Sequence, residues 1–189
     1  MILASQSPRR KELLGLFCNE FEVIPAKGEE LLPEGILPRD AVMLLSRQKA
    51  EEIRARKFPD GNVTDVIIAA DTVVAIDHEI LGKPRTAPHA AEMLRRLSGR
   101  KHSVFTGVTL ITPGETVTFA EETLVEFFPL TGQEIADYVS SGEPMDKAGA
   151  YGIQGRGALL VKRIEGDYYN VMGLPAGEVY HRLKSMGIL

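Results

Sequence analysis

An uninterrupted apolar stretch, VIIAA at residues 66–70, limits the folds open to this chain more than any other feature. A strand without polar positions cannot present either face to water, so the stretch predicts a central strand covered by helices on both sides. Helical spacing of apolar residues over 38–57 and 88–97, and long strand patterns over 103–112 and 116–128, surround it. Strands that alternate with helices predict an α/β fold, and the long hairpin predicts a mixed sheet.

The remaining elements are shorter, and each follows from a local signal. Residues 73–76 either continue the central strand or pair back on it, and Asp77-His78-Glu79 predicts a turn. A capping box, Thr131-Gly132-Gln133-Glu134, opens a helix over 135–139. Apolar patterns predict further strands at 1–4, 21–25 and 158–164, and further helices at 8–18 and 175–186. No linker composition interrupts the chain, so residues 1–189 are expected to form one domain, with a bilobed shape left open.

Composition and charge exclude several classes of protein. With 44% hydrophobic residues the chain can build a sizeable core, and its net charge of -4 provides no basic field for nucleic acid. No run approaches the ~18 apolar residues of a membrane span, and only four apolar residues precede Ser5, too few for a signal peptide. The single cysteine, Cys18, lies in an apolar run and is expected to be a packed thiol. We therefore expect a cytoplasmic protein with no membrane or nucleic-acid partner.

The segment Ser7-Pro8-Arg9-Arg10 is charged against the usual preference of a helix start. Ser7 is a typical N-cap and Pro8 a typical first helical residue. Arg9 and Arg10 would then lie in the first turn, where free backbone N–H groups already make the helix end electropositive. A helix N-terminus that follows a strand binds anions, and two guanidinium groups match phosphate oxygens. The alternative, in which both arginines point to solvent, fits this segment equally well.

Asp71 directly follows the apolar run, where an unpaired carboxylate would lose much of its hydration free energy. Either Asp71 lies at the carboxyl end of the strand, where α/β sheets bind ligands, or it is paired. In a cleft this carboxylate would serve as a general base or as a metal ligand. A structural aspartate that caps the following turn is the alternative.

Two glycine-containing segments add candidates for ligand binding. In Gly82-Lys83-Pro84, Lys83 is a candidate phosphate contact, although a solvated loop lysine is the more ordinary interpretation. The stretch DKAGAYGIQG at 146–155 lets a planar ligand approach the backbone, and the Gln154 amide offers both donors and acceptors.

Isolated charged residues are weaker candidates. Glu30 is either a metal carboxylate or a solvated loop residue, and Lys49 either extends along the surface or points a cation into a cleft. The four histidines lack metal-ligand spacing and are expected in surface or capping roles: His78, His89, His102 and His181.

Six segments, in order along nearly the whole chain, resemble the Maf family of nucleoside triphosphate pyrophosphatases: LASQSPRR, AADTVV, LGKP, FTGV, DKAGAYGIQG and NVMGLP. The resemblance implies hydrolysis of a nucleoside triphosphate between the α- and β-phosphates, with a divalent cation, Mg or Mn. It also implies a fold like that of inosine triphosphate pyrophosphatases, an elongated mixed sheet flanked by helices with two lobes around a deep cleft. Homodimers are common in that wider fold, and the sequence leaves the oligomeric state open.

The resemblance also implies roles for individual residues. Asp71 corresponds to the proton acceptor that activates water, and Glu30 to an acidic residue near the metal. The triphosphate would be bound by Ser5, Arg9, Arg10 and Lys83, with Lys49 as a helper.

Three positions relate to substrate choice within the family. The branch acting on dTTP and UTP carries Arg, Thr and Gln where this chain has Arg9, Thr72 and Gln154. The branch acting on 7-methyl-GTP carries Trp, Gln and Glu there. The resemblance therefore implies a dTTP/UTP pyrophosphatase, with modified pyrimidine nucleotides as further substrates. A 7-methyl-GTP preference, or a nucleotide-binding regulator of cell division and septum formation acting through a partner, are the alternatives.

Overall fold

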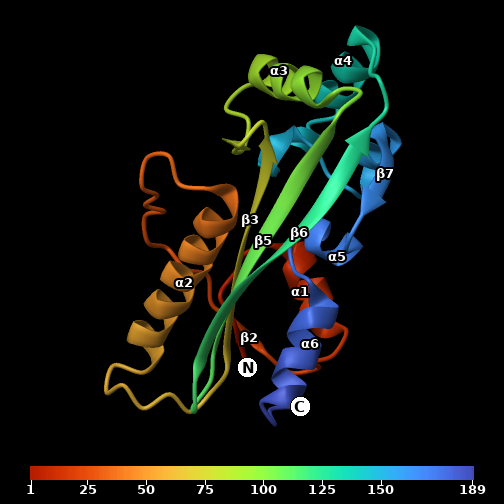
Figure 1. The fold of residues 1–189 in the computed structure, drawn as a ribbon. Helices are drawn as coiled ribbons and strands as arrows, with labels where there is room; N and C mark the ends of the chain where they lie inside the picture. Colours follow the sequence, from red (N-terminus) through yellow and green to blue (C-terminus); the bar gives the residue numbers. More distant parts are fainter.

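The computed structural model describes all 189 residues and is built around a long, twisted, seven-stranded sheet (Figure 1). The strand order is β2-β1-β3-β5-β6-β7, with β4 paired to β3. β1 pairs in parallel with β2 and β3, and every other pair is antiparallel, which confirms the predicted mixed sheet. The strands are β1 Ile2–Leu3, β2 Glu22–Val23, β3 Ile67–Ile76, β4 Glu79–Leu81, β5 Lys101–Ile111, β6 Thr116–Phe127 and β7 Val161–Glu165.

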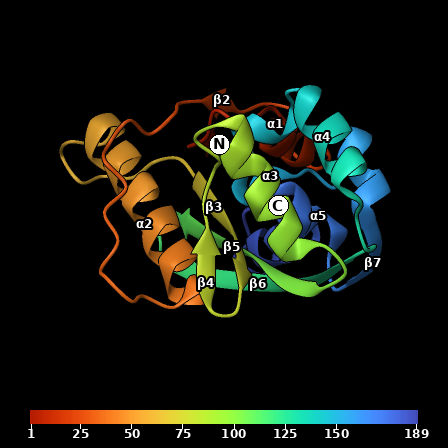
Figure 2. The ribbon, with the colours of Figure 1, turned by 90° about the horizontal axis from the view of Figure 1, so that it is seen from above.

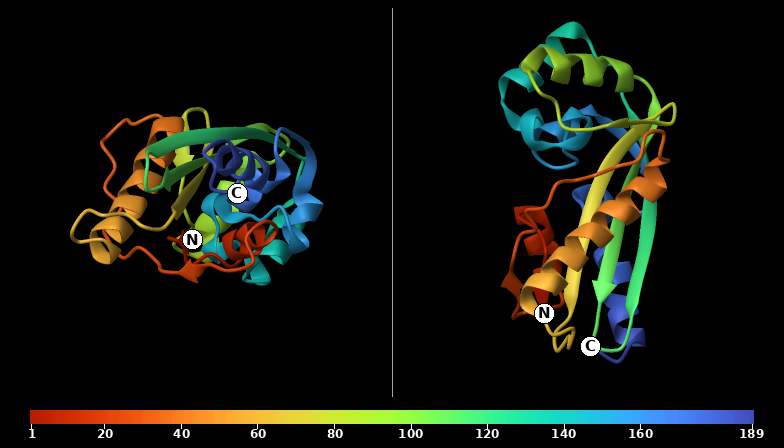
Figure 3. Two further views of the ribbon diagram at one scale, coloured as in Figure 1. Left: turned by 90° about the horizontal axis from the view of Figure 1, so that it is seen from below. Right: turned by 90° about the vertical axis from the view of Figure 1, so that its left-hand side faces the viewer.

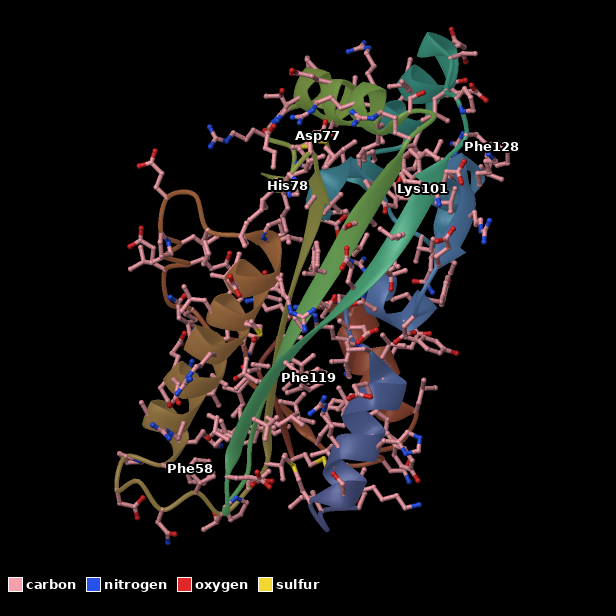
Figure 4. The ribbon with its side chains drawn as sticks, viewed as in Figure 1. Phe58, Asp77, His78, Lys101, Phe119 and Phe128 are labelled. Atoms are coloured by element: carbon pink, nitrogen blue, oxygen red, sulfur yellow. The ribbon has the colours of Figure 1, made fainter.

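Three long strands, β3, β5 and β6, run the length of the molecule. Residues 73–76 continue β3 rather than pairing back, and the chain then turns into β4. Asp77 and His78 form that turn with φ angles of 53° and 65°, a left-handed pair that suits a two-residue hairpin. Figure 4 labels both residues at one end of β3, and Phe58 at the opposite end of the molecule.

Six α-helices cover the sheet (Figures 1 and 2). The α1 helix begins after the predicted N-cap Ser7, and the predicted capping box at Thr131 opens α4. Three 3-10 turns, η1 Glu143–Asp146, η2 Ala148–Ala150 and η3 Gly155–Leu160, follow α4. The α-helices are α1 Pro8–Gly15, α2 Pro38–Lys57, α3 Ala87–Leu97, α4 Gly132–Ser140, α5 Tyr168–Met172 and α6 Ala176–Ser185.

The apolar stretch at 66–70 is buried on both faces, as its composition predicts. Ile68 and Ala70 belong to a core with Leu13 and Leu14 of α1 and with residues of α6. Ile67 and Ala69 belong to a second core with Ala50 and Ile53 of α2. A third core, at the far end of the same strands, packs Val74 and Val104 under α3 and α4. The sheet therefore has helices at both ends of one face, with α2 on the other (Figure 3).

Gly107 on β5 allows α2 to approach the sheet closely. A Cβ atom at this position would overlap the backbone of Val42 and Met43. We expect Gly107→Ala to lower the free energy of unfolding by about 2–3 kcal/mol, because a buried helix must move off a packed sheet. Urea denaturation measures this loss. Gly114→Ala is the matched control, since nothing lies within 4 Å of its Cβ position, and an equal loss there would contradict the steric explanation.

Two local predictions were wrong in detail, and one short element was not predicted. The helix predicted at 8–18 ends at Gly15, and the strand predicted at 158–164 is the η3 turn followed by β7 from Val161. The short helix α5 was not predicted; it begins just before the segment NVMGLP and overlaps the start of that segment. Cys18 is buried, as expected, and its thiol donates to the Glu20 carbonyl at 3.3 Å. None of the helices has both the length and the apolar character needed to cross a bilayer.

Candidate active site

A gap in the edge of the sheet leaves the middle of β3 without a strand partner on one side. On one side, β5 pairs with β3 continuously from Ile67 to Ala75. On the other side, β1 pairs only with Ile67 and Ile68, and β4 only from Val74 onward. Residues 69–73 therefore lie at an open edge between β1 and β4. Asp71, predicted to lie at the end of a strand or to be paired, lies within β3, and this gap makes it reachable.

A cavity of about 890 Å³ opens at this gap. Residues from both ends of the sheet line it, from α1 at one end to the segment 143–155 at the other. The structure brings all nine residues singled out in the sequence to this one cavity: Ser5, Arg9, Arg10, Glu30, Lys49, Asp71, Thr72, Lys83 and Gln154.

Lys49 lies between two carboxylates on the α2 side of the cavity. Its Nζ donates to Asp71 Oδ1 at 2.5 Å and lies 2.8 Å from Glu30 Oε1. The hydrogen bond from Lys49 lowers the pKa of Glu30, with the nearby Lys83 and Arg10 contributing charge. Lys49 therefore points its cation into the cleft and does not extend along the surface. Asp71, for which pairing was one alternative, is paired.

Arg10 is held on the opposite side of β3 by three hydrogen bonds. Nε donates to the Gly173 carbonyl at 2.7 Å, and Nη2 donates to Thr72 Oγ1 at 2.9 Å. Nη1 donates to Ser5 Oγ at 3.3 Å. Burial lowers the pKa of Arg10, and the charge of Asp71 opposes that effect. Thus Arg10 does not point to solvent, and its planar group has a fixed orientation beside the cavity.

Arg9 reaches toward the far end of the cavity. Its Nη1 lies 4.0 Å from Asp146 Oδ2, on the η1 turn, so α1 and the segment after α4 meet across the opening. Arg9 is still partly exposed, with a third of its side chain accessible, and its charge stays available to a ligand. Backbone N–H groups at the start of α1, capped by Ser7, add positive potential at the same place.

One lining residue, Glu143, lies outside every segment that the sequence singled out. Asp146, Lys147 and Tyr151 belong to the predicted segment 146–155 and line the same cavity as Gln154. The glycine-rich pattern identified the loop but not its anchors, since Glu143 precedes it in a segment without a motif. His102 was also misjudged, because it is buried rather than at the surface, and its Nε2 lies 2.7 Å from the Tyr151 hydroxyl.

Buried His102 makes the stability of this fold pH-dependent. Burial lowers its pKa from 6.5 to about 4, so between these values the unfolded chain binds a proton that the native chain does not. The contribution is complete above pH 6.5 and is lost as the pH falls toward 4. We expect the free energy of unfolding to fall by about 2 kcal/mol from pH 7 to 5 through this group. Urea titrations of wild type and His102→Phe at both pH values measure it, and identical pH dependence in the two proteins would contradict it.

The donor atoms of the cavity fit a hard divalent cation. No group of three or more His, Cys, Asp or Glu side chains gathers in the structure. Glu30 and Asp71, however, both contact the Lys49 ammonium group, so two carboxylates already converge on one positive charge. Magnesium binds through one or two carboxylates, with waters and substrate phosphates completing its coordination. This sparse pair of oxygen ligands is of that kind.

The fold and the cavity define an α/β protein with a cleft at an open sheet edge, in which a carboxylate lies among cationic side chains. Comparison with known proteins identifies its family. A family model described as Maf-like protein matches residues 1–186, and the chain belongs to the Maf family. The resemblance found in the sequence is therefore confirmed.

The chain is similar over its full length to curated relatives. A protein named dTTP/UTP pyrophosphatase from Geobacillus sp. (strain WCH70) is 50% identical over 187 residues, which cover 99% of this chain and 98% of that protein. Another of the same name from Carboxydothermus hydrogenoformans is 51% identical over 187 residues, covering 98% and 97%. A solved structure, described as the Staphylococcus aureus Ham1 protein, aligns with a TM-score of 0.45 and 15% identity over 67% of this chain and 70% of that one.

Proposed function

We propose that this protein is a nucleoside triphosphate pyrophosphatase that hydrolyses dTTP and UTP to the monophosphate and pyrophosphate. The observation that carries the proposal is the cavity in which Asp71 lies among the cations of Lys49, Arg10 and Lys83. Full-length relatives about 50% identical bear the name dTTP/UTP pyrophosphatase, which supports the same substrates. Modified pyrimidine nucleotides belong to the proposed substrate range.

In this proposal Asp71 accepts the proton of the water that cleaves the bond between the α- and β-phosphates. Pyrophosphate leaves, and the nucleoside monophosphate keeps the new oxygen. The Lys49 ammonium, 2.5 Å from Asp71 Oδ1, orients the carboxylate toward the open edge of β3. A positioned general base of this kind contributes about 10²–10⁴-fold to a rate.

The triphosphate is bound by groups that are already in place. A guanidinium carries five N–H groups and Arg10 uses three in the protein, which leaves two for phosphate oxygens. Arg9, Lys83 and the Ser5 hydroxyl add contacts along the same cavity. Cations fixed before the substrate arrives stabilise the charge that develops in the transition state without further reorganisation.

A divalent cation, Mg or Mn, would be held by Asp71 and Glu30. When bound it supplies positive charge that neutralises the phosphate oxygens and the leaving pyrophosphate. Lys49 would then share both carboxylates with the metal, because it contacts each of them. Whether Glu30 holds the metal can be tested without an activity assay. Electron paramagnetic resonance measures Mn²⁺ binding to Glu30→Gln directly.

Base selection is assigned to Gln154, Thr72 and Arg9. Gln154, within the glycine-rich loop, lines the cavity, and its amide can pair with a uracil or thymine edge. Thr72 acts through Arg10, since its hydroxyl accepts from Nη2 at 2.9 Å. The Thr72 hydroxyl in turn lies 2.9 Å from that of Thr106, which donates to the Asn170 carbonyl, so this chain of bonds fixes Arg10 from behind.

A panel of nucleoside triphosphates tests the proposal. With Mg²⁺ or Mn²⁺ we expect pyrophosphate release to be fastest with dTTP and UTP. A dominant rate with 7-methyl-GTP would overturn the pyrimidine assignment while leaving the chemistry intact. Nucleotide binding without turnover of any triphosphate would instead favour a regulator of cell division that acts through a partner.

A further inference from the structure

The loop that carries Gln154 is tied down on both sides by one pair of side chains, Glu143 of η1 and Tyr138 of α4. Glu143 Oε1 accepts from the Gly157 N–H at 3.1 Å, and Oε2 accepts from the Arg156 N–H at 3.0 Å. Upstream of Gln154, the Tyr138 hydroxyl oxygen accepts from the Gly152 N–H at 3.2 Å. Tyr138 itself donates to Glu143 Oε1 at 3.1 Å, which joins the two anchors.

The glycines of this loop provide the space for these two anchors. A Cβ at Gly155, whose φ is +65°, would lie 2.9 Å from Glu143 Oε2. A Cβ at Gly157 would lie 2.2 Å from the Gly152 carbonyl oxygen and 2.7 Å from the Tyr138 hydroxyl. All three separations are shorter than real Cβ contacts allow. The glycine pattern therefore serves backbone contact with Glu143 and Tyr138, in addition to approach by a ligand.

The charge state of the pair suits this role. Burial raises the pKa of Glu143, but hydrogen bonds from Gly157, Arg156 and Tyr138 outweigh it and bring the pKa below its usual value. Burial also raises the pKa of Tyr138, so its hydroxyl keeps the proton it donates. Both carboxylate oxygens of Glu143 are engaged by the protein. Although Glu143 borders the cavity, its polar atoms hold the loop rather than awaiting a ligand.

We propose that Glu143, together with Tyr138, is a positioning residue for base selection, because it fixes the backbone on either side of Gln154. The inference rests on the proposed function and adds residues that determine how strongly this enzyme prefers uracil and thymine over cytosine. Neither side chain forms a hydrogen bond with Asp71, Lys49 or Arg10, so the pair does not act directly on these three residues of the phosphate end. Arg9, a further phosphate contact, lies 4.0 Å from Asp146 on the same η1 turn.

The test uses a ligand with a base and a ligand without one. In Glu143→Gln the new NH₂ group faces backbone N–H donors, so the loop loses at least one charge-assisted hydrogen bond. We expect affinity for α,β-methylene-UTP to fall about tenfold or more, and affinity for inorganic triphosphate to stay unchanged. The ratio of kcat/KM for UTP to that for CTP should fall as well. Tyr138→Phe, which removes one hydroxyl, should move the same quantities in the same direction.

Glu134→Gln is the matched control. Glu134 lies in α4, the helix that also carries Tyr138, and accepts from the Thr131 N–H and hydroxyl at 2.7 Å. It does not line the cavity. It should lower stability without changing the UTP-to-CTP ratio. Equal loss of UTP and inorganic triphosphate binding, or an unchanged ratio in Tyr138→Phe, would overturn the positioning role. Wild type that hydrolyses no triphosphate would instead refute the proposed function, so the two failures are distinguishable.

Discussion

Asp71→Asn is expected to lower kcat by about 10²–10⁴-fold while UTP binding stays close to wild type. Asparagine has the shape of aspartate and keeps an oxygen for the Lys49 ammonium, which lies 2.5 Å from Oδ1 in the native protein. It cannot take a proton from water. The loss should therefore appear in kcat rather than in the affinity for α,β-methylene-UTP. Steady-state pyrophosphate release at saturating UTP measures the first quantity, and calorimetric titration measures the second.

A control variant at a second carboxylate and a titration with metal show how the result of Asp71→Asn is to be interpreted. Asp77→Asn changes the same residue type at the end of the same strand, where Asp77 pairs with Arg100 at 2.7 Å, and should leave kcat unaltered. A rate of Asp71→Asn close to that of wild type would remove Asp71 from the role of general base. If raised Mg²⁺ or Mn²⁺ concentration restores the rate, Asp71 acts mainly as a metal ligand.

Arg10→Ala is expected to lower both the affinity for nucleotide and the stability of the protein without ligand. The substitution leaves Gly173 O and Thr72 Oγ1 without their donor, and should lower the free energy of unfolding by about 1–3 kcal/mol. Loss of charged hydrogen bonds to phosphate should reduce affinity about 10–100-fold. At a ligand concentration about 100 times the wild-type Kd, stabilisation by α,β-methylene-UTP would then fall from about 2.7 kcal/mol to about 1.4 kcal/mol for a tenfold loss of affinity and to about 0.4 kcal/mol for a 100-fold loss. Thermal unfolding with and without ligand measures both effects.

Lys11→Ala is the control for charge, because it removes a cation from the next position of α1 without touching the cavity. Full ligand stabilisation is expected there. If Arg10→Ala retains the wild-type shift in Tm on ligand addition, Arg10 is a structural residue that braces α5 and the phosphate contact belongs to its neighbours.

The parts of this fold that the sequence predicts well depend on local signals. The apolar stretch at 66–70, the hairpin of β5 and β6, and the caps at Ser7 and Thr131 each follow from spacing within a few residues. The regions that were predicted wrongly are stabilised by distant partners. The η3 turn, taken for a strand, begins at Gly155 with a positive φ and is fixed by Glu143. No periodicity within 158–164 reports that contact.

The candidate site shows the same difference between features with local signals and features that depend on distant residues. Unusual residues such as Asp71 and Arg10 are visible in the sequence because each breaks a local preference. The pairings are not visible, since Lys49, itself a candidate, lies 22 residues from Asp71, and Gly173 lies 163 residues from Arg10. The same holds for His102, whose burial depends on Tyr151, 49 residues away. Residue type thus indicated the candidates for the site, and only the fold supplied their geometry.

The open edge of β3 also limits the length of a molecule that can lie along it. It spans residues 69–73 and is closed by β1 at one end and by β4 at the other. Five residues at about 3.3 Å each give an opening of about 17 Å along the strand. A molecule that lies along this edge has to fit between the two flanking strands. The length of this edge therefore matches the proposed substrate, a free nucleotide lying between β1 and β4.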